Sequence, residues 1–202
     1  MAQSVPIVSL PTLWSVLVDG LGPVWPTSRT QIDGCSLGDA WPCSSMPRSP
    51  PAQPWENIVP FHKLTQWLCY SLMAPMQKLL GMRFAGAELL TGLPEYRNGG
   101  LLIDTGLLTL KKADMDRGII TYKKNAELSG KAMLEVTPMF EASDDVIVEW
   151  RALTVCFLDL LLEAVNKGLG LGGAQSLSLA QMLEAGSWKV RFSTKPGSNV
   201  LI

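Results

Sequence analysis

The segment at residues 143–168 constrains the fold more than any other part of the chain. It begins with Ser143, Asp144 and Asp145, a capping hydroxyl and two carboxylates that suit the positive end of a helix dipole. Apolar residues then recur at spacings of three and four until Gly168, which is a stop signal. The pattern predicts a long helix over 144–166 with one buried side, formed by Trp150, Leu153, Phe157, Leu161 and Val165.

Three shorter segments also show helical signals. Residues 11–21 carry apolar side chains on one side, formed by Leu13, Val16, Leu17 and Leu21, before Gly22 and Pro23. A capping-box spacing between Ser178 and Gln181 starts another helix, whose pattern ends at Gly186.

The third segment, 61–80, predicts a helix with Pro60 in its first turn and a kink or break at Pro75. Its expected buried stripe is Phe61, Leu64, Leu68, Leu72, Met76 and Leu79.

The regions between these helices are irregular in composition. Residues 22–54 are dense in Pro, Gly and Ser and predict a surface loop whose aromatic flanks, 37–41 and Trp55, pack. Residues 93–110 indicate either a hairpin-like bend or a loop that introduces a short helix, and we favour the loop.

We predict a mainly α single domain of five to six helices, with short irregular or β-like pieces around 96–122. Its expected parts are an apolar helix and loop (1–54), a helical core (55–190) and an irregular tail (191–202).

Composition excludes several classes of protein. The 17 basic and 18 acidic residues nearly cancel and form no basic cluster, so we expect no nucleic-acid partner. The longest apolar run, near 152–165, contains Asp159 and Glu163, which excludes a membrane span. Four cysteines without C-x-x-C spacing and a single histidine predict no metal and no cofactor. A cytoplasmic protein with reduced thiols is expected.

The first candidate site surrounds His62. On a helix His62 and Gln66 share a face, and with Lys63 and Tyr70 they would line a polar pocket. A histidine is suited to acid–base chemistry because its pKa lies near neutrality. The alternative is a histidine at the helix start or surface without chemistry.

The second candidate site is the string Glu95, Tyr96, Arg97 and Asn98 before two glycines. As a turn it would let the backbone approach a ligand while Arg97 grips a phosphate or carboxylate. The alternative is a hairpin turn with an exposed ion pair.

Three further charged residues lie in apolar surroundings. Asp104 is either desolvated and reactive or a cap for the next turn. Glu149 and Arg151 are two apart on the long helix, so they need separate partners.

The glycine-rich run at 168–173 follows a helix and lacks the Lys-Ser/Thr step, so it matches no nucleotide-binding fingerprint.

Five strings together carry a resemblance: LGPVWP at 21–26, LGDAW at 37–41, VPFHKLTQWL at 59–68, LTGLPEYRNGGLLID at 90–104 and VEWRALT at 148–154. Over residues 12–190 the chain resembles the C-terminal half of the uracil catabolism protein 4 family of fungi and bacteria. Those proteins are longer, so we expect a truncated chain that lacks the family's N-terminal half.

The resemblance implies a role in pyrimidine degradation, with hydrolysis of a ribosylated uracil or ribosylurea derivative as the attractive reaction. Catalytic roles are expected for His62, Asp104 and Glu149, and substrate binding for Lys63, Gln66, Glu95, Tyr96, Arg97, Asn98 and Arg151. The partner would be a small uracil-derived ligand. The alternative is a noncatalytic homologue or subunit that binds another protein through exposed apolar surface. If His62, Gln66 and residues 95–100 line one cleft, Trp67 or Trp150 would back it.

Overall fold

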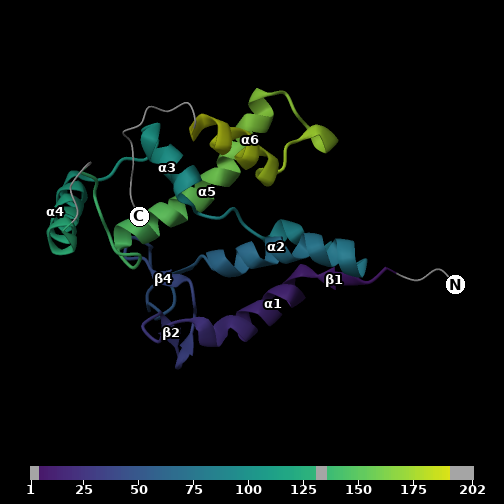
Figure 1. The fold of residues 1–202 in the computed structure, drawn as a ribbon, viewed down its shortest axis with the longest axis horizontal. Helices are drawn as coiled ribbons and strands as arrows, with labels where there is room; N and C mark the ends of the chain where they lie inside the picture. The colour runs from purple at the N-terminus through teal and green to yellow at the C-terminus, as the bar shows by residue number, and fades with distance from the viewer. Residues whose placement is uncertain (1–4, 131–135, 192–202) are drawn as a thin grey trace. The chain divides into compact units, whose positions relative to one another are not determined.

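A computed structural model describes residues 5–130 and 136–191 of the chain. Within these residues the structure contains six α-helices, and its strands are only two or three residues long (Figure 1). The prediction of a mainly α fold with short β-like segments is therefore confirmed. Every helix of the described part is too short or too polar to cross a lipid bilayer.

The described residues divide into two compact units. Unit 1 contains residues 5–42 and 48–93, and unit 2 contains residues 43–47, 94–130 and 136–191. The division predicted from composition at residues 54 and 190 stays a prediction, and residues 192–202 of the predicted tail lie outside the described part.

Unit 1 is built on two helices that run side by side, α1 (Leu10–Leu21) and α2 (Lys63–Leu80) (Figure 1). A short 3-10 helix, η1 (Gly22–Val24), follows α1, and a second, η2 (Ala87–Leu89), lies beyond α2.

Three two-stranded sheets complete unit 1. β1 (Ile7–Ser9) pairs in parallel with β6 (Arg83–Ala85). The other two pairs are antiparallel: β2 (Gln31–Ile32) with β3 (Cys35–Ser36), and β4 (Ala40–Pro42) with β5 (Ile58–Pro60).

The structure corrects two buried faces predicted for unit 1. In α1 the buried residue is Leu10, and Val16, expected on the apolar side, is 63% exposed. In α2 the buried residues are Thr65, Gln66 and Cys69, whereas Leu64 is half-exposed.

The predicted start of α2 at Phe61 was too early, although Phe61 itself is buried as expected. Pro60 belongs to β5, and the backbone amides of Phe61 and His62 both donate to the Asp39 carbonyl. Helical geometry therefore begins at Lys63. The helix continues through Pro75 without a break.

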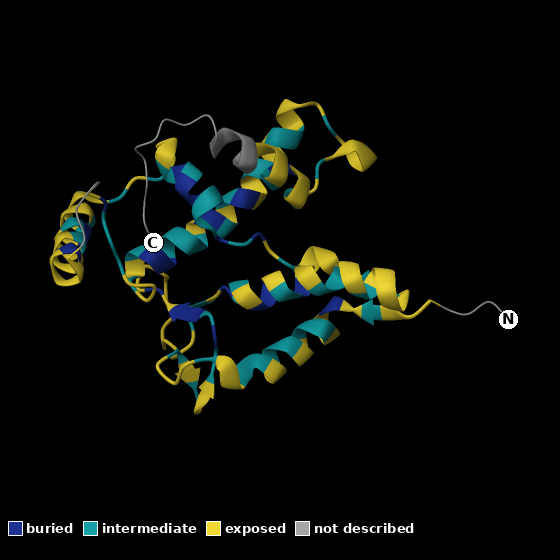
Figure 2. Ribbon diagram, in the orientation of Figure 1, coloured by how far each residue is buried: buried dark blue, intermediate teal, exposed yellow. Residues whose placement is uncertain are grey.

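Unit 2 is helical throughout its main elements. They are α3 (Tyr96–Asp104), α4 (Lys112–Ser129), α5 (Asp145–Gly168), the 3-10 helix η3 (Gly173–Gln175) and α6 (Leu179–Arg191). Around 96–122, where short irregular or β-like pieces were expected, residues 105–111 are irregular and the rest is helical in α3 and α4, with no strand in this range. The loop that introduces a short helix at 93–110 is confirmed. Buried residues gather on α3 and α5, which pack together (Figure 2).

The long helix α5 was predicted to within two residues, but two of its details differ. Its cap is the Asp144 side chain, which accepts from the Val146 amide at 3.0 Å, rather than Ser143. Its buried residues are Ile147, Val148, Thr154 and Leu158, so the predicted side, which included Leu153, is displaced around the helix.

The start of α6 was also predicted from its cap. The Ser178 amide donates to Gln181 Oε1 at 2.8 Å, and the Gln181 amide donates to Ser178 Oγ at 3.3 Å, which confirms the capping box. The helix continues past Gly186 to Arg191, so the predicted end was too early.

Candidate functional site

The backbone at His62 is strained, as it is at Asp33 in the same unit. His62 has φ 46° and ψ 38°, which places it in the left-handed region. That conformation costs a residue with a side chain about 1 kcal/mol, and such residues gather at functional sites. The two amide bonds to the Asp39 carbonyl, 2.9 Å from Phe61 and 3.0 Å from His62, hold the segment in place.

The Asp39 side chain also accepts hydrogen bonds that hold this segment in place. Its Oδ2 accepts from the Lys63 amide at 3.0 Å, and its Oδ1 accepts from Trp41 Nε1 at 2.8 Å. Asp39 thus joins β4 to the first turn of α2. Sequence reasoning did not select this residue, although it lies in the LGDAW string that carries the family resemblance.

The His62 ring lies at the edge of a tryptophan. The centroids of the His62 and Trp14 rings are 5.5 Å apart, with the planes at 76°. Burial of the imidazole lowers its pKa, although the nearby Asp39 charge acts in the opposite direction. His62 is therefore neutral at physiological pH and suited to accept a proton.

The Gln66 side chain is buried, and both polar atoms of its amide group form hydrogen bonds within unit 1. Its Nε2 donates to the Phe61 carbonyl at 3.0 Å and to Thr91 Oγ1 at 2.9 Å. Its Oε1 accepts from the Thr91 amide at 2.9 Å. Tyr70 adds a bond from its hydroxyl to the Thr91 carbonyl at 3.2 Å. These bonds tie residue 91 to α2.

A pocket of about 260 Å³ lies among these residues. His62, Gln66 and Thr91 supply its polar groups. The rest of its lining is apolar, formed by Leu10, Pro11, Trp14, Pro60, Phe61, Leu89 and Leu90. An apolar pocket with a few fixed polar groups is the usual form of a small-ligand site.

In unit 2 the string at 95–98 forms the start of a helix rather than a turn. Glu95 is the N-cap of α3 and makes a reciprocal capping box with Asn98, whose Oδ1 accepts from the Glu95 amide at 2.8 Å. Arg97 Nη2 lies 3.0 Å from Glu95 Oε2. Tyr96, the first residue of the helix, is half-buried. Both the open turn and the hairpin are corrected here, because the capping box stabilises helical geometry from Tyr96 onward.

The remaining predicted residues lie on α3 and α5. Asp104 is the last residue of α3 and is exposed, which contradicts a desolvated carboxylate there. Glu149 and Arg151 are half-buried on α5. Between them, Trp150 Nε1 donates to the Gly99 carbonyl at 3.0 Å.

The structure thus brings His62, Lys63 and Gln66 together in unit 1. Glu95, Tyr96, Arg97 and Asn98 gather at the first turn of α3 in unit 2, where Glu149 and Arg151 lie on α5. The cleft predicted to join the two groups stays a prediction. In the described part of the chain, no three His, Cys, Asp or Glu side chains gather as metal ligands would.

The fold and the pocket define a mainly α protein with a small histidine-lined cavity. The chain belongs to the family described as "Protein of unknown function (DUF1688)", whose profile matches residues 1–191. No solved structure matches the chain.

Two curated relatives specify the similarity further. Uracil catabolism protein 4 of Lachancea kluyveri is 45% identical over 186 residues, which are 91% of this chain and 40% of that protein. Protein urg3 of Schizosaccharomyces pombe is 47% identical over 177 residues, 88% of this chain and 37% of that protein. The resemblance stated from the sequence strings is confirmed, and the chain spans about two fifths of the length of these relatives.

Proposed function

We propose that this chain takes part in uracil catabolism and that the His62 pocket binds a uracil-derived ligand. The name of the Lachancea kluyveri relative and its 45% identity support the metabolic role. The observation that carries the site is His62 itself. Its imidazole is half-buried at the wall of a small apolar pocket, and its backbone is strained. The carbonyl and the side chain of Asp39 both accept hydrogen bonds from the backbone of this segment.

The reaction proposed is hydrolysis of an N-ribosyl bond in a ribosylated uracil or ribosylurea derivative. In such a step the bond between the sugar carbon and nitrogen breaks, and the oxygen of water bonds to the carbon. The neutral His62 would take a proton from the water and return it to the departing nitrogen. Trp14 at the pocket wall offers a surface against which a flat base can stack.

The roles predicted for the other residues stay proposals within their own units. In unit 1, Lys63 lies next to His62, and in unit 2 Asp104 or Glu149 would supply a carboxylate while Arg97 and Arg151 would hold phosphate or hydroxyl groups. Gln66 and Asn98 were proposed to read the base or urea. Their amide groups bond within the chain, so Gln66 supports a ligand by fixing the wall of the His62 pocket, and Asn98 fixes the start of α3.

The test combines binding with turnover. Calorimetric titration with uracil, uridine and uridine monophosphate should give binding to the chain, and a reducing-sugar assay should detect ribose or ribose phosphate released from the nucleoside or nucleotide. His62→Gln should lower turnover by at least about 100-fold. Lys78→Gln, at an exposed position of α2, should leave both measurements unchanged. Full turnover by His62→Gln would contradict the assignment.

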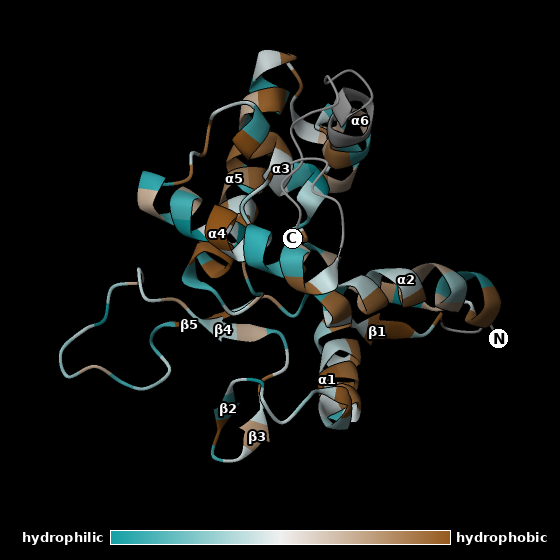
Figure 3. Cartoon of the chain, turned by 60° about the vertical axis from the view of Figure 1, so that its left-hand side comes forward, coloured by the Kyte–Doolittle hydropathy of each residue, from teal (hydrophilic) through white to brown (hydrophobic). Residues whose placement is uncertain are grey.

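The alternative is a noncatalytic subunit that acts through protein contacts. Large apolar side chains on the surface favour it: Ile7 is 70%, Leu79 81% and Leu128 90% exposed. Strand β1 and parts of α1 and α2 are hydrophobic (Figure 3). If this alternative holds, the chain binds none of the three compounds, while sedimentation analysis shows association that Leu79→Ser weakens.

A further inference from the structure

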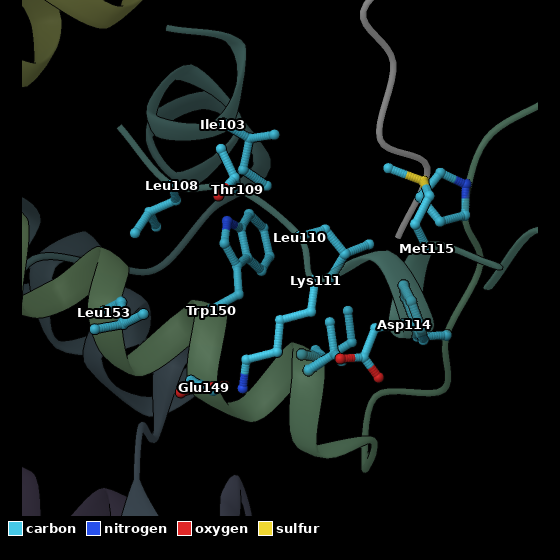
Figure 4. A pocket seen from close by; sticks show the side chains of 14 residues that line it. Ile103, Leu108, Thr109, Leu110, Lys111, Asp114, Met115, Glu149, Trp150 and Leu153 are labelled. Atoms are coloured by element: carbon cyan, nitrogen blue, oxygen red, sulfur yellow. The ribbon is translucent and has the colours of Figure 1, made fainter. Parts of the chain in front are cut away.

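A second pocket, of about 250 Å³, lies within unit 2. It is bounded by α3, α4, α5 and the segments that join them (Figure 4). Ten of its fourteen lining residues are apolar, among them Leu108, Leu110, Met115, Phe140, Trp150 and Leu153. None of them lines the His62 pocket.

One wall of this pocket is fixed before any ligand arrives. Trp150 Nε1 donates to the Gly99 carbonyl at 3.0 Å, and a Cβ placed on Gly99 would lie 2.5 Å from Trp150 Cζ2. The indole is therefore held by a hydrogen bond and packed directly against the backbone of α3. A ring ordered in this way offers a stacking surface without loss of side-chain freedom on binding.

The charged groups at the pocket balance one another. Lys111 and Glu149 carry opposite charges, and Figure 4 shows the Lys111 side chain extending past Trp150 in the direction of Glu149. A third charged residue at the pocket is Asp114. Its side chain accepts a hydrogen bond from Arg117 Nη2 at 3.0 Å, so this carboxylate already has a charged partner. A charged ligand would meet groups of both signs here, so the lining favours neither an anion nor a cation.

We propose that the unit 2 pocket binds a flat, uncharged aromatic or heteroaromatic ring that stacks on Trp150. The size of the pocket agrees with this ligand class. An apolar cavity of roughly 150 Å³ in a protein interior holds benzene, so the larger pocket here suits one or two fused rings.

The experiment uses phenol and cyclohexanol, two neutral probes of nearly equal size of which only phenol is flat. The protein carries a ¹³C label in its methionine methyl groups, and the Met115 signal is assigned with Met115→Leu. Phenol should shift the Met115 signal and bind about tenfold more tightly than cyclohexanol, which is the upper range for an aromatic pair.

Two variants and a control locate the binding. Trp150→Leu should weaken phenol binding about tenfold, because the stacking surface is lost. Leu153→Trp, at a position on the pocket wall, should fill the space and abolish the Met115 shift. Trp55→Leu, at an exposed tryptophan of unit 1, should change nothing.

Each other outcome overturns the proposal. Equal affinity for the two probes would remove the case for a flat ligand. A Met115 signal unmoved at saturating phenol, or equal losses in Trp55→Leu and Trp150→Leu, would show adsorption to exposed apolar surface. If circular dichroism shows that Trp150→Leu does not fold, Leu153→Trp decides: retained phenol binding with the space filled contradicts the site.

Discussion

In unit 1 the candidate pocket is held by hydrogen bonds from a few polar side chains, whereas in unit 2 it is held by direct contact between helices. Asp39 accepts a hydrogen bond from the first turn of α2, and Gln66 accepts one from the amide of residue 91. In unit 2, Gly99 lets Trp150 and Thr154 approach the backbone of α3.

The stability of the two units should therefore respond to different kinds of substitution. A site held by hydrogen bonds loses stability when a partner is removed, because a buried donor or acceptor is left unpaired. A site held by close packing loses stability when volume is added, because neighbouring rings have no space to move into. The substitutions below probe one sensitivity or the other.

The largest effect is expected from Gly99→Ala. The added Cβ would lie 2.5 Å from Trp150 Cζ2 and 2.6 Å from Thr154 Oγ1, so α3 and α5 would have to separate. We expect a loss of about 3 kcal/mol in the free energy of unfolding, measured by urea titration and circular dichroism.

Gly168→Ala, at the end of α5, is the matched control, because nothing lies within 4 Å of its Cβ position. It should be neutral or stabilise by about 0.5 kcal/mol. An equal loss in both variants would show that helix propensity, not close approach, explains the effect.

The next largest effect is expected from Asp39→Ala. The Lys63 amide and Trp41 Nε1 would both lose their acceptor, at a cost of about 2 kcal/mol in the free energy of unfolding. Asp19→Ala, at an exposed position of α1, should change it by less than about 0.5 kcal/mol. If both variants unfold at the wild-type urea concentration, Asp39 does not fasten the segment.

A smaller effect is expected where unit 2 uses an exposed ion pair. Arg117 bonds to Asp144 and Asp114 and lies over the Phe140 ring at 5.0 Å. Arg117→Ala should cost about 1 kcal/mol, and Lys112→Ala, which breaks the more exposed pair with Asp116, about 0.3 kcal/mol.

The pH dependence of this pair has a definite sign. The Arg117 hydrogen bond, with help from the Val146 amide and the Arg117 charge, holds the pKa of Asp144 below its ordinary value, although burial opposes this. The stabilisation is therefore present above that ordinary value and is lost as pH falls through the lowered pKa. Arg117→Ala should be less sensitive to acid than wild type, and identical pH profiles would contradict the pair.

The smallest effect concerns His62 in unit 1. Because burial lowers the pKa of His62 below 6.5, the unfolded state binds the proton more tightly. Its contribution to stability is present above about pH 6.5 and is lost as pH falls towards the folded-state pKa.

Urea titrations at about pH 7.5 and about pH 5.5 measure this contribution. The free energy of unfolding should fall more in wild type than in His62→Gln. A larger fall in the variant would mean that the imidazole is charged in the folded protein.

Features that depend on contacts within one element could be predicted from the sequence. Signals confined to one element were reliable: the carboxylates at 144 and 145 located the start of α5, and Ser178 with Gln181 located that of α6. Such caps act on their own helix within a few residues, so the chain around them is not needed to interpret them.

The buried faces and the pockets depend on partners distant in the chain. The start of α2 was placed too early because Asp39, far away in sequence, holds residues 61 and 62 outside the helix. Leu64 and Leu79 of the predicted stripe are exposed, because burial depends on which neighbours cover each face of a helix. For the same reason Gln66 was recognised as a pocket residue while its partner, Thr91, was not. Residues 99 and 100 were assigned to a turn because glycine permits positive φ, whereas Gly99 serves close packing.

The pairing of β1 with β6 has a consequence for the order in which unit 1 folds. Residues 7–9 hydrogen-bond to residues 83–85, so β1 waits for most of unit 1 to be synthesised before its partner exists. Contacts between segments so far apart in sequence are slow to form, because the intervening chain must first close into a loop. On a ribosome α1 therefore leaves the exit tunnel long before this strand pair can form, and closure of the pair is expected to be a late step in folding.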